Sequence, residues 1–484
     1  MLVFDESVHL QFYSPGRGAG ARFRAMNQTL SRRWAATVAR APGRMALIEA
    51  SGGKRWTRAA LQAAAARWAA THQHAELSGK RVAMSVPNGA EWFRVFLGLL
   101  ACGAVPAPLD PTEPEEAQLA AARSIGAPFL WREGGLFPVA GVRTETAVRG
   151  ECLVKVTSGS SGEPRGLGAS HAQMEADGRQ ICRSMGIRPG DTNLAAIPLG
   201  YSYGLGNLVL PLLLQGTRIV FGSSPLPHAI ASDAGRYRPT VFPAVPSILR
   251  ALAASELSPR SLSSLRLVIS AGSPIAPEVC RDFASRFRIR IHGFYGTSET
   301  GGIAFDRTGE ATLLGRSVGT PLAGVRVRPI TGGRITISGG AVLGRGRFSP
   351  ADRARLNARG ELVLTGRTDR VVKVAGRRVD LAEVEASLRV LPGIREAFAH
   401  VGTGADAPLA AAVATELPAA EVRRLLRARV ASWKIPSRIV TLAQFPTSSR
   451  GKPDARRLRQ LLSAPRTVSS ISMFRADRQM SAPR

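Results

Sequence analysis

Apolar and polar positions along the first part of the chain alternate in blocks. An Ala-rich helical pattern at residues 59–72 precedes a short apolar run at 81–86, which ends at a Pro-Asn-Gly turn. An apolar helical pattern follows at 91–101, and a second apolar run follows at 104–109. Short strands that alternate with helices are typical of a parallel sheet covered by helices. The pattern therefore predicts an α/β unit over residues 28–131.

The same rhythm continues and then changes. Apolar runs predict further strands at residues 192–197, 218–221, 240–242, 265–270 and 288–294. After Gly315 the runs become short and Gly-punctuated, at 325–329, 334–338 and 362–365, which predicts an all-β part such as a small barrel or sandwich. Beyond residue 366, a strand at 371–374, a helix at 381–390 and a strongly basic helix at 419–431 indicate an α+β part.

These changes predict two domains of mixed α/β and β class. A large domain, with parallel-type α/β subdomains and a small β-barrel, is expected at residues 28–365. A small α+β domain is expected at 366–465. The two ends, 1–27 and 466–484, are polar, basic and without pattern, so we expect them to be poorly ordered.

Charge and cysteine content limit the function classes. The chain has 65 Lys+Arg against 35 Asp+Glu, a formal net charge of +30, yet only six of the basic residues are lysines. An arginine bias along the whole chain reflects coding composition as much as binding. A nucleic-acid-binding protein would show binding that falls steeply with salt, but no nucleic-acid motif supports this class. The four cysteines lie far apart, and no segment is typical of a membrane span or a secretory signal, so we expect a cytoplasmic protein.

A Gly/Ser-rich loop follows a short apolar strand at residues 153–156. Residues 157–166 are Thr-Ser-Gly-Ser-Ser-Gly-Glu-Pro-Arg-Gly. The backbone N–H groups of such a loop can converge on an anion, its hydroxyls add donors, and Arg165 adds positive charge. A flexible linker has a similar composition. The strand before the loop and the Pro-Arg-Gly ending favour an anion-binding loop.

The loop resembles the phosphate loop of the adenylate-forming superfamily, which contains acyl-CoA synthetases, aryl-CoA ligases and peptide-synthetase adenylation domains. Other segments resemble motifs of that family in the same order along most of the chain. They are a small-residue turn at 270–274, an adenine and magnesium motif at 293–302, a hinge at 366–370 and a lysine loop at 446–454. Three positions depart from the family pattern. Arg165 stands in place of a lysine, Tyr201 in place of a frequent histidine, and Pro350-Ala351-Asp352 in place of Thr-Gly-Asp.

The resemblance implies a role for each matching residue. Glu299, a hard oxygen ligand, is implied to bind Mg²⁺, and Lys452 to stabilise the charge that develops during adenylation. Asp369 is implied to be the hinge. Lys373 and Gly376 match the segment that meets the thiol acceptor, and Tyr201 and Gly204 match the acyl pocket. The residues implied to bind ATP are Thr157, Ser158, Gly159, Ser160, Ser161, Gly162, Arg165, Gly272, Tyr295, Gly296, Thr297, Ser298, Asp352 and Arg367.

The resemblance also implies a two-step reaction. A fatty or aryl carboxylic acid and Mg·ATP give an acyl-adenylate and pyrophosphate, and coenzyme A then takes the acyl group with release of AMP. Residues 200–205 contain no acidic side chain that could pair with a substrate ammonium, which favours an acid without an α-amino group. Two alternatives stay open: an acyl-AMP ligase that loads an acyl carrier protein, and a degenerate, inactive relative.

Overall fold

The computed structural model describes residues 29–143, 148, 150–158, 164–367, 371–374, 377–402, 408–427, 429–430, 434–448 and 453–463. Both ends that the sequence predicts to be poorly ordered lie outside these residues. The chain divides into two compact units. Unit 1 consists of Met1–Val327 and Ile337–Phe348, and unit 2 of Arg328–Thr336 and Ser349–Arg484.

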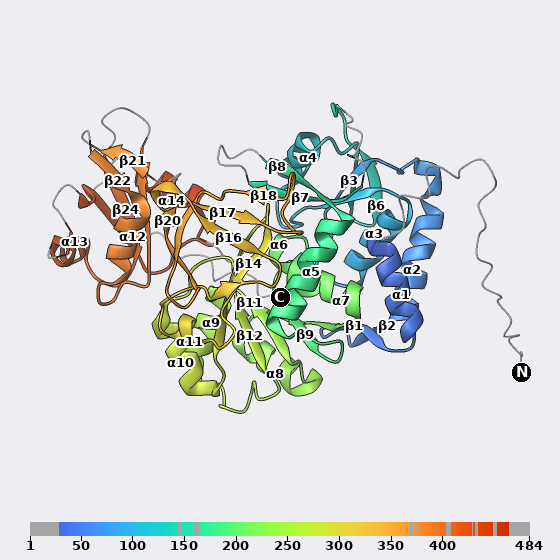
Figure 1. The fold of residues 1–484 in the computed structure, drawn as a ribbon, viewed down its shortest axis with the longest axis horizontal. Helices are drawn as coiled ribbons and strands as arrows, with labels where there is room; N and C mark the ends of the chain where they lie inside the picture. Colours follow the sequence, from blue (N-terminus) through green and yellow to red (C-terminus); the bar gives the residue numbers. More distant parts are fainter. Residues whose placement is uncertain are drawn as a thin grey trace, which may run out of the picture. The chain divides into compact units, whose positions relative to one another are not determined.

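A nine-stranded sheet forms the centre of unit 1 (Figure 1), in the order β15-β14-β13-β12-β11-β9-β10-β1-β2. The neighbouring pairs from β1 to β13 are parallel, and β2, β14 and β15 add antiparallel edges. This confirms the predicted parallel α/β architecture. The strands are β1 (Met45–Glu49), β2 (Lys54–Thr57), β9 (Thr192–Ala195), β10 (Arg218–Phe221), β11 (Val241–Ala244), β12 (Leu267–Ser270), β13 (Ile291–Thr297), β14 (Gly301–Phe305) and β15 (Thr320–Pro321).

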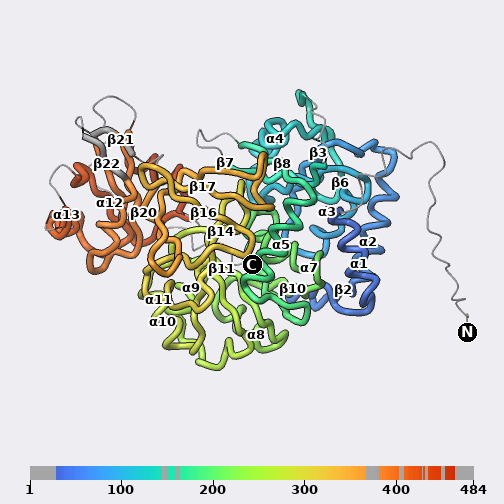
Figure 2. The backbone as a smooth tube through the Cα atoms, viewed as in Figure 1, coloured from blue at the N-terminus to red at the C-terminus, as the bar shows by residue number. Residues whose placement is uncertain are grey.

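Two hydrophobic cores lie on opposite faces of this sheet. Alternate residues of one strand point to opposite faces, so Leu47 and Ile219 join the first core while their neighbours Ile48 and Val220 join the second. The first core is covered by α1 (Leu30–Arg40), α2 (Arg58–Thr71), α3 (Ala90–Ala101) and α7 (Leu210–Gln215). The second is covered by α8 (Pro227–Tyr237), α9 (Pro246–Ala253) and α10 (Pro277–Phe287), which lie apart from the first group in Figure 2. Burial on both faces explains why these strands are apolar runs.

A second sheet and a hairpin complete most of unit 1. The sheet has the order β4-β3-β5-β6, and its strands β3 and β4 are parallel. Hairpin β7–β8 leads into α5, which begins with a capping box: Ser170 Oγ accepts from the Gln173 amide, and Gln173 Oε1 accepts from the Ser170 amide. The bounds are β3 (Arg81–Met84), β4 (Val105–Pro108), α4 (Glu115–Ser124), β5 (Phe129–Arg132), β6 (Gly135–Pro138), β7 (Glu151–Ser158), β8 (Pro164–Ser170), α5 (His171–Met185), α6 (Ser202–Gly204) and α11 (Glu310–Leu313).

The all-β part predicted after Gly315 consists of two small sheets. In the part of the chain that the structure describes, β16, β17 and β18 form one sheet and β19 and β20 form an antiparallel hairpin, in place of a single closed barrel. Each strand pairs with its neighbour in the chain because tight turns, such as the one at Gly360 with φ +70°, reverse the backbone. The bounds are β16 (Arg326–Pro329), β17 (Ile335–Ser338), β18 (Arg347–Phe348), β19 (Asp352–Leu356) and β20 (Leu362–Arg367).

Unit 2 has its own hydrophobic core. Hairpin β21–β22 and the three-stranded sheet β23-β24-β25 are accompanied by three helices. The predicted domain boundary at 365/366 falls inside β20, and the whole of β20 belongs to unit 2. The prediction that two domains move about this boundary stays a prediction. The bounds are β21 (Val371–Val374), β22 (Arg377–Asp380), α12 (Leu381–Arg389), β23 (Glu396–Val401), β24 (Leu409–Ala414), α13 (Ala419–Arg427), β25 (Arg438–Leu442) and α14 (Ala455–Ser463).

None of the helices in the described ranges combines the length and the apolar character that crossing a membrane requires. The cytoplasmic location stays a prediction.

Candidate active site

Three of the segments singled out in the sequence meet at one edge of the nine-stranded sheet. Residues 200–205 come after β9, Gly272 lies just after β12, and Tyr295–Thr297 end β13. Since β9, β11, β12 and β13 run parallel, their carboxyl ends lie at the same edge, which is where open α/β sheets bind ligands. Gly272 has φ +95°, a conformation that favours glycine, so the small-residue turn there has a backbone reason.

The turn between β13 and β14 is tightly folded and needs small residues. The register shifts between Tyr295 and Gly296, and a Cβ atom on Gly296 would lie 2.5 Å from the Gly301 carbonyl oxygen. The Oγ1 atoms of Thr297 and Thr300 are 3.1 Å apart, and Thr300 is buried. The turn therefore presents Tyr295, Thr297 and Glu299, all partly exposed, from one compact backbone segment.

Three contacts from other elements fix the backbone of this turn. Lys155 Nζ, from β7, donates to the Ser298 carbonyl oxygen at 3.3 Å. The Leu343 amide donates to the Glu299 carbonyl oxygen at 2.8 Å. Asp177 Oδ1, from α5, accepts from the Gly302 amide at 2.9 Å. The residues implied to bind the metal and the phosphates thus sit on a fixed support.

Two of these supporting groups are buried charges. Lys155 is 3% exposed and Asp177 is 2% exposed. Burial lowers the pKa of Lys155 and raises the pKa of Asp177, because both charged forms lose hydration. Each charge opposes the shift of the other, and Glu299 adds a further negative charge that favours the ammonium form of Lys155.

The turn fits a Mg²⁺ ion that is shared with phosphate oxygens. Among the residues placed by the structure there is no group of three or more His, Cys, Asp or Glu side chains that could hold a metal by themselves. Mg²⁺ is commonly bound through one or two carboxylates together with water and substrate phosphates. The carboxylate of Glu299, beside the hydroxyls of Thr297 and Ser298, matches that donor set.

The segment implied to line the acyl pocket contacts the same turn. Ser202 Oγ donates to Ser298 Oγ at 3.0 Å. The Tyr203 hydroxyl lies 3.3 Å from the Ala244 carbonyl oxygen, at the end of β11, and 3.0 Å from that of Ile269 in β12, and its ring is 6.0 Å from the Phe294 ring. The predicted acid and nucleotide segments are therefore adjacent.

Tyr201 and Gly204 hold this acid segment in place. The Tyr201 hydroxyl donates to Asp110 Oδ2 at 2.6 Å. Position 204 must be a glycine, because a Cβ atom there would lie 2.0 Å from the Pro198 carbonyl oxygen and clash with it.

The phosphate-loop residues are placed only in part. The Thr157 hydroxyl donates to the Arg165 carbonyl oxygen at 3.4 Å across hairpin β7–β8, and Arg165 is exposed. Ser158 ends β7, and the structure places its backbone only. Gly159, Ser160, Ser161 and Gly162 lie outside the described residues.

The predicted residues of unit 2 are placed to different degrees. The backbone of Asp352 lies opposite that of Arg367 in the β19–β20 register, so the implied ribose pair sits at one end of a hairpin. Lys373 lies opposite Arg378 in β21–β22, where the structure places its backbone only. Asp369, Gly376 and Lys452 lie outside the described residues.

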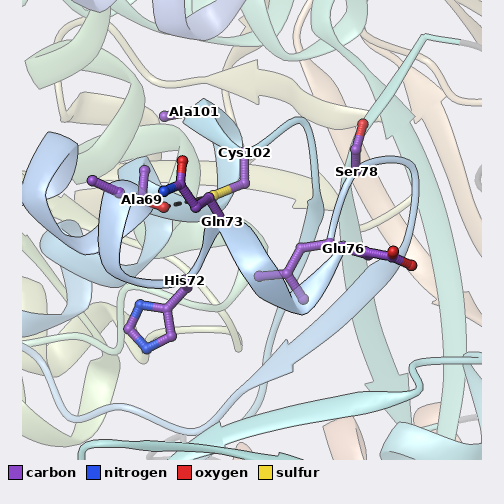
Figure 3. Close-up of a pocket in the computed structure, with 9 residues that line it drawn as sticks. Ala69, His72, Gln73, Glu76, Ser78, Ala101 and Cys102 are labelled. Atoms are coloured by element: carbon purple, nitrogen blue, oxygen red, sulfur yellow. Dashed lines mark hydrogen bonds between the residues drawn. The ribbon is translucent and has the colours of Figure 1, made fainter.

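A separate cavity of about 330 Å³ lies between the ends of α2 and α3 (Figure 3). Its lining includes His72, Gln73, Glu76 and Cys102, and the Cys102 thiol contacts the Ala69 carbonyl oxygen at 3.7 Å. None of the residues of the family-like motifs lines it.

Sequence reasoning missed three residues beside the site. Lys155, Asp177 and Asp110 lie 143, 125 and 91 positions from the residues that they contact. The one signal in the sequence was Lys155, a charged residue inside the apolar run Leu-Val-Lys-Val of a chain with few lysines.

Comparison with known proteins assigns the family. The model of a family described as AMP-binding enzyme matches residues 34–133 and 151–332, more than half of the chain. The chain belongs to the AMP-binding enzyme family. This confirms the predicted resemblance to the adenylate-forming superfamily.

Individual members of the AMP-binding family are similar at low identity. The chain is 28% identical over 338 residues to a feruloyl-CoA synthase of Amycolatopsis, a match covering 62% of this chain and 68% of that one. It is 27% identical over 346 residues to a 4-hydroxybenzoate–CoA/benzoate–CoA ligase of Rhodopseudomonas palustris, covering 63% of each. The fold is similar to that of O-succinylbenzoate coenzyme A synthetase from Bacillus subtilis in complex with AMP, with TM-score 0.77, 21% identity and coverage of 90% and 99%.

Proposed function

We propose that this AMP-binding protein activates an aromatic carboxylic acid with ATP and transfers the acyl group to coenzyme A. One observation carries the proposal: the segment implied to bind the acid contacts the turn implied to bind the nucleotide, where Ser202 donates to Ser298. Two substrates that must react need such adjacent sites, since holding them in the reacting geometry supplies a large part of the rate enhancement.

In this proposal the nucleotide is held by the β13–β14 turn and the loop after β7. The Tyr295 ring stacks on the adenine, and Thr297 and Ser298 face phosphate oxygens. Glu299 would hold Mg²⁺, which when bound would neutralise charge on those oxygens. Asp352 and Arg367 bind the ribose. Lys452 stabilises the charge that develops when the acid carboxylate attacks the α-phosphate.

The acid is proposed to be aromatic for two reasons. The Tyr203 ring of the acid segment and the Phe294 ring of β13 are 6.0 Å apart and tilted by 43°, and aromatic rings favour contact with an aromatic ligand. The similar proteins named above carry feruloyl and benzoate substrates in their names. These reasons favour an aryl acid over a fatty acid among the two classes that the sequence left open.

Coenzyme A is the proposed acceptor, by analogy with the names of the same proteins. Asp369 would be the hinge about which the small domain turns, bringing Lys373 and Gly376 to the thiol. An acyl carrier protein as acceptor, and an inactive relative, are the alternatives that the test must separate.

The test is product formation with a panel of acids. The full chain is incubated with Mg·ATP and benzoate, 4-hydroxybenzoate, ferulate or a fatty acid, with and without coenzyme A, and the products are identified by mass spectrometry. The proposal predicts an aryl-CoA and AMP with at least one aromatic acid, lost in Lys452→Ala. Adenylate formation that coenzyme A does not discharge would favour the carrier-protein alternative. No AMP above the Lys452→Ala background with any acid would reject the enzyme.

A further inference from the structure

A buried lysine, Lys155, contacts the turn that carries the proposed metal ligand Glu299. Lys155 belongs to β7, and side chains two positions apart on a strand share a face, so Lys155 and Thr157 point to the same side of the hairpin. The Lys155 ammonium thus connects the strand that leads into the phosphate loop with the Ser298 carbonyl oxygen.

Volume does not explain a lysine at this position. In the part of the chain that the structure describes, its 3%-exposed side chain makes one hydrogen bond, although an ammonium has three donors. A methionine of similar length would fill the space without the cost of desolvating a charge. What the ammonium adds is a directed contact with the residue before Glu299, together with a positive charge near the Glu299 carboxylate.

Asp177 supports the same turn from its other end and balances the charge. Its Oδ1 atom holds the Gly302 amide at 2.9 Å, so Lys155 and Asp177 together grip a carbonyl and an amide that bracket Glu299. Lys155 and Asp177 are opposite charges that each favour the ionised form of the other, and Glu299 is the partly exposed carboxylate of the turn.

We propose that Lys155 is a positioning residue for Mg·ATP. Its ammonium donates to the Ser298 carbonyl oxygen and thereby fixes Thr297, Ser298 and Glu299 in the orientation that binds the metal and the phosphates. The inference rests on the proposed function. Lys155 acts through the turn, so its loss should reduce the part of ATP affinity that depends on Mg²⁺ and leave the rest.

The experiment measures the affinity of the full chain for ATP by titration calorimetry, once with excess Mg²⁺ and once with EDTA, without any acid. The ratio of the two dissociation constants is the Mg²⁺-dependent gain. We expect Lys155→Met to reduce this gain by about 10-fold or more, the usual effect of losing a hydrogen bond from a charged donor. Lys155→Arg, which keeps the charge and the donor, should restore part of it.

A second variant separates positioning from folding. Lys155→Met leaves Asp177 buried and uncompensated, so its melting temperature should fall. The double variant Lys155→Met/Asp177→Asn removes both charges and should recover the melting temperature, while the Mg²⁺-dependent gain stays low. The cycle of Lys155→Met with Glu299→Gln should be strongly non-additive, because both changes remove the same metal contact.

Each outcome decides the question. A gain that is unchanged in Lys155→Met, or a cycle that is additive, overturns the role of Lys155 while the proposed function stands. Equal loss of ATP affinity with Mg²⁺ and with EDTA makes Lys155 a purely structural residue and also overturns the inference. If the wild-type chain shows no Mg²⁺-dependent binding of ATP, both the proposed function and the inference about Lys155 are wrong.

Discussion

Replacing Gly301 by alanine should destabilise unit 1 far more than a glycine-to-alanine change normally does. Gly301 follows the turn with φ +67°, and a Cβ atom there would lie 2.3 Å from Asp177 Oδ1. The left-handed conformation alone costs an alanine about 1–2 kcal/mol. The carboxylate must also move away, which breaks its 2.9 Å hydrogen bond to the Gly302 amide, and losing a bond to a charged acceptor costs about 1.5–3 kcal/mol.

Gly186 offers a matched control for this variant. It ends α5 with φ +63°, and a Cβ atom added there would have no neighbour within 4 Å, so Gly186→Ala should show the conformational cost alone. The two costs at Gly301 combine to about 2.5–5 kcal/mol. For a unit of roughly 340 residues, each kcal/mol corresponds to about 1.4 °C of melting temperature.

Differential scanning calorimetry of the full chain provides the assay. Gly301→Ala should lower the melting temperature of unit 1 by about 4–7 °C, and Gly186→Ala by about 1–3 °C. Gly301→Ala should also weaken Mg·ATP binding, whereas Gly186→Ala should not. If the two variants melt within a degree of each other, the close packing of Asp177 against the turn is not as the structure shows, and the reasoning fails.

Three further predictions concern charge, the acid segment and pH. Asp177→Asn removes the charged acceptor of the Gly302 amide and a negative charge that favours the Lys155 ammonium, so it should lower the melting temperature by about 2–4 °C, from the 1.5–3 kcal/mol typical of a hydrogen bond to a charged group; a loss below 1 °C would contradict this. Tyr201→Phe removes the 2.6 Å hydrogen bond to Asp110 and should raise KM for the acid, with the Kd for ATP unchanged in calorimetry; a matching change in both would show that Tyr201 does not act on the acid side. Burial lowers the pKa of His171 and His292, so the unfolded chain binds more protons than the folded chain, and thermal stability should fall as the pH drops below about 6.5. The drop between pH 8 and pH 5.5 should be smaller in His171→Asn, and an equal drop would refute the role of that residue.

The sequence predicted the central architecture because strands buried on both faces are continuous apolar runs. Strand β10 has the predicted bounds, and β9, β11 and β12 lie within about two residues of them. The start of β13 was predicted three residues too early. Arg288 caps α10 in the left-handed conformation, with φ 58°, and so belongs to the end of the helix. A cap formed by arginine, in place of the usual glycine, gives no signal in the sequence.

The candidate site was predictable where its residues are neighbours in the chain. The motif at 293–302 comprises the end of β13, the turn and the start of β14, and glycines occupy it because a Cβ atom at those positions would clash with neighbouring atoms. The supports from β7 and α5 were not predictable, since Lys155 and Asp177 reach the turn only after distant strands and helices have packed. A single sequence shows the buried charge at Lys155 but not the carbonyl oxygen that it binds.

The proposal that this chain forms acyl-adenylates is tested most directly by isotope exchange between pyrophosphate and ATP. The full chain is incubated with ATP, Mg²⁺, labelled pyrophosphate and each aromatic acid, without coenzyme A, and the label in ATP is counted. We predict exchange that depends on the acid, falls steeply in Glu299→Gln, and is absent in Lys452→Ala. Exchange that is equal with and without every acid, or that is the same in both variants as in the wild type, would contradict adenylate formation by this site.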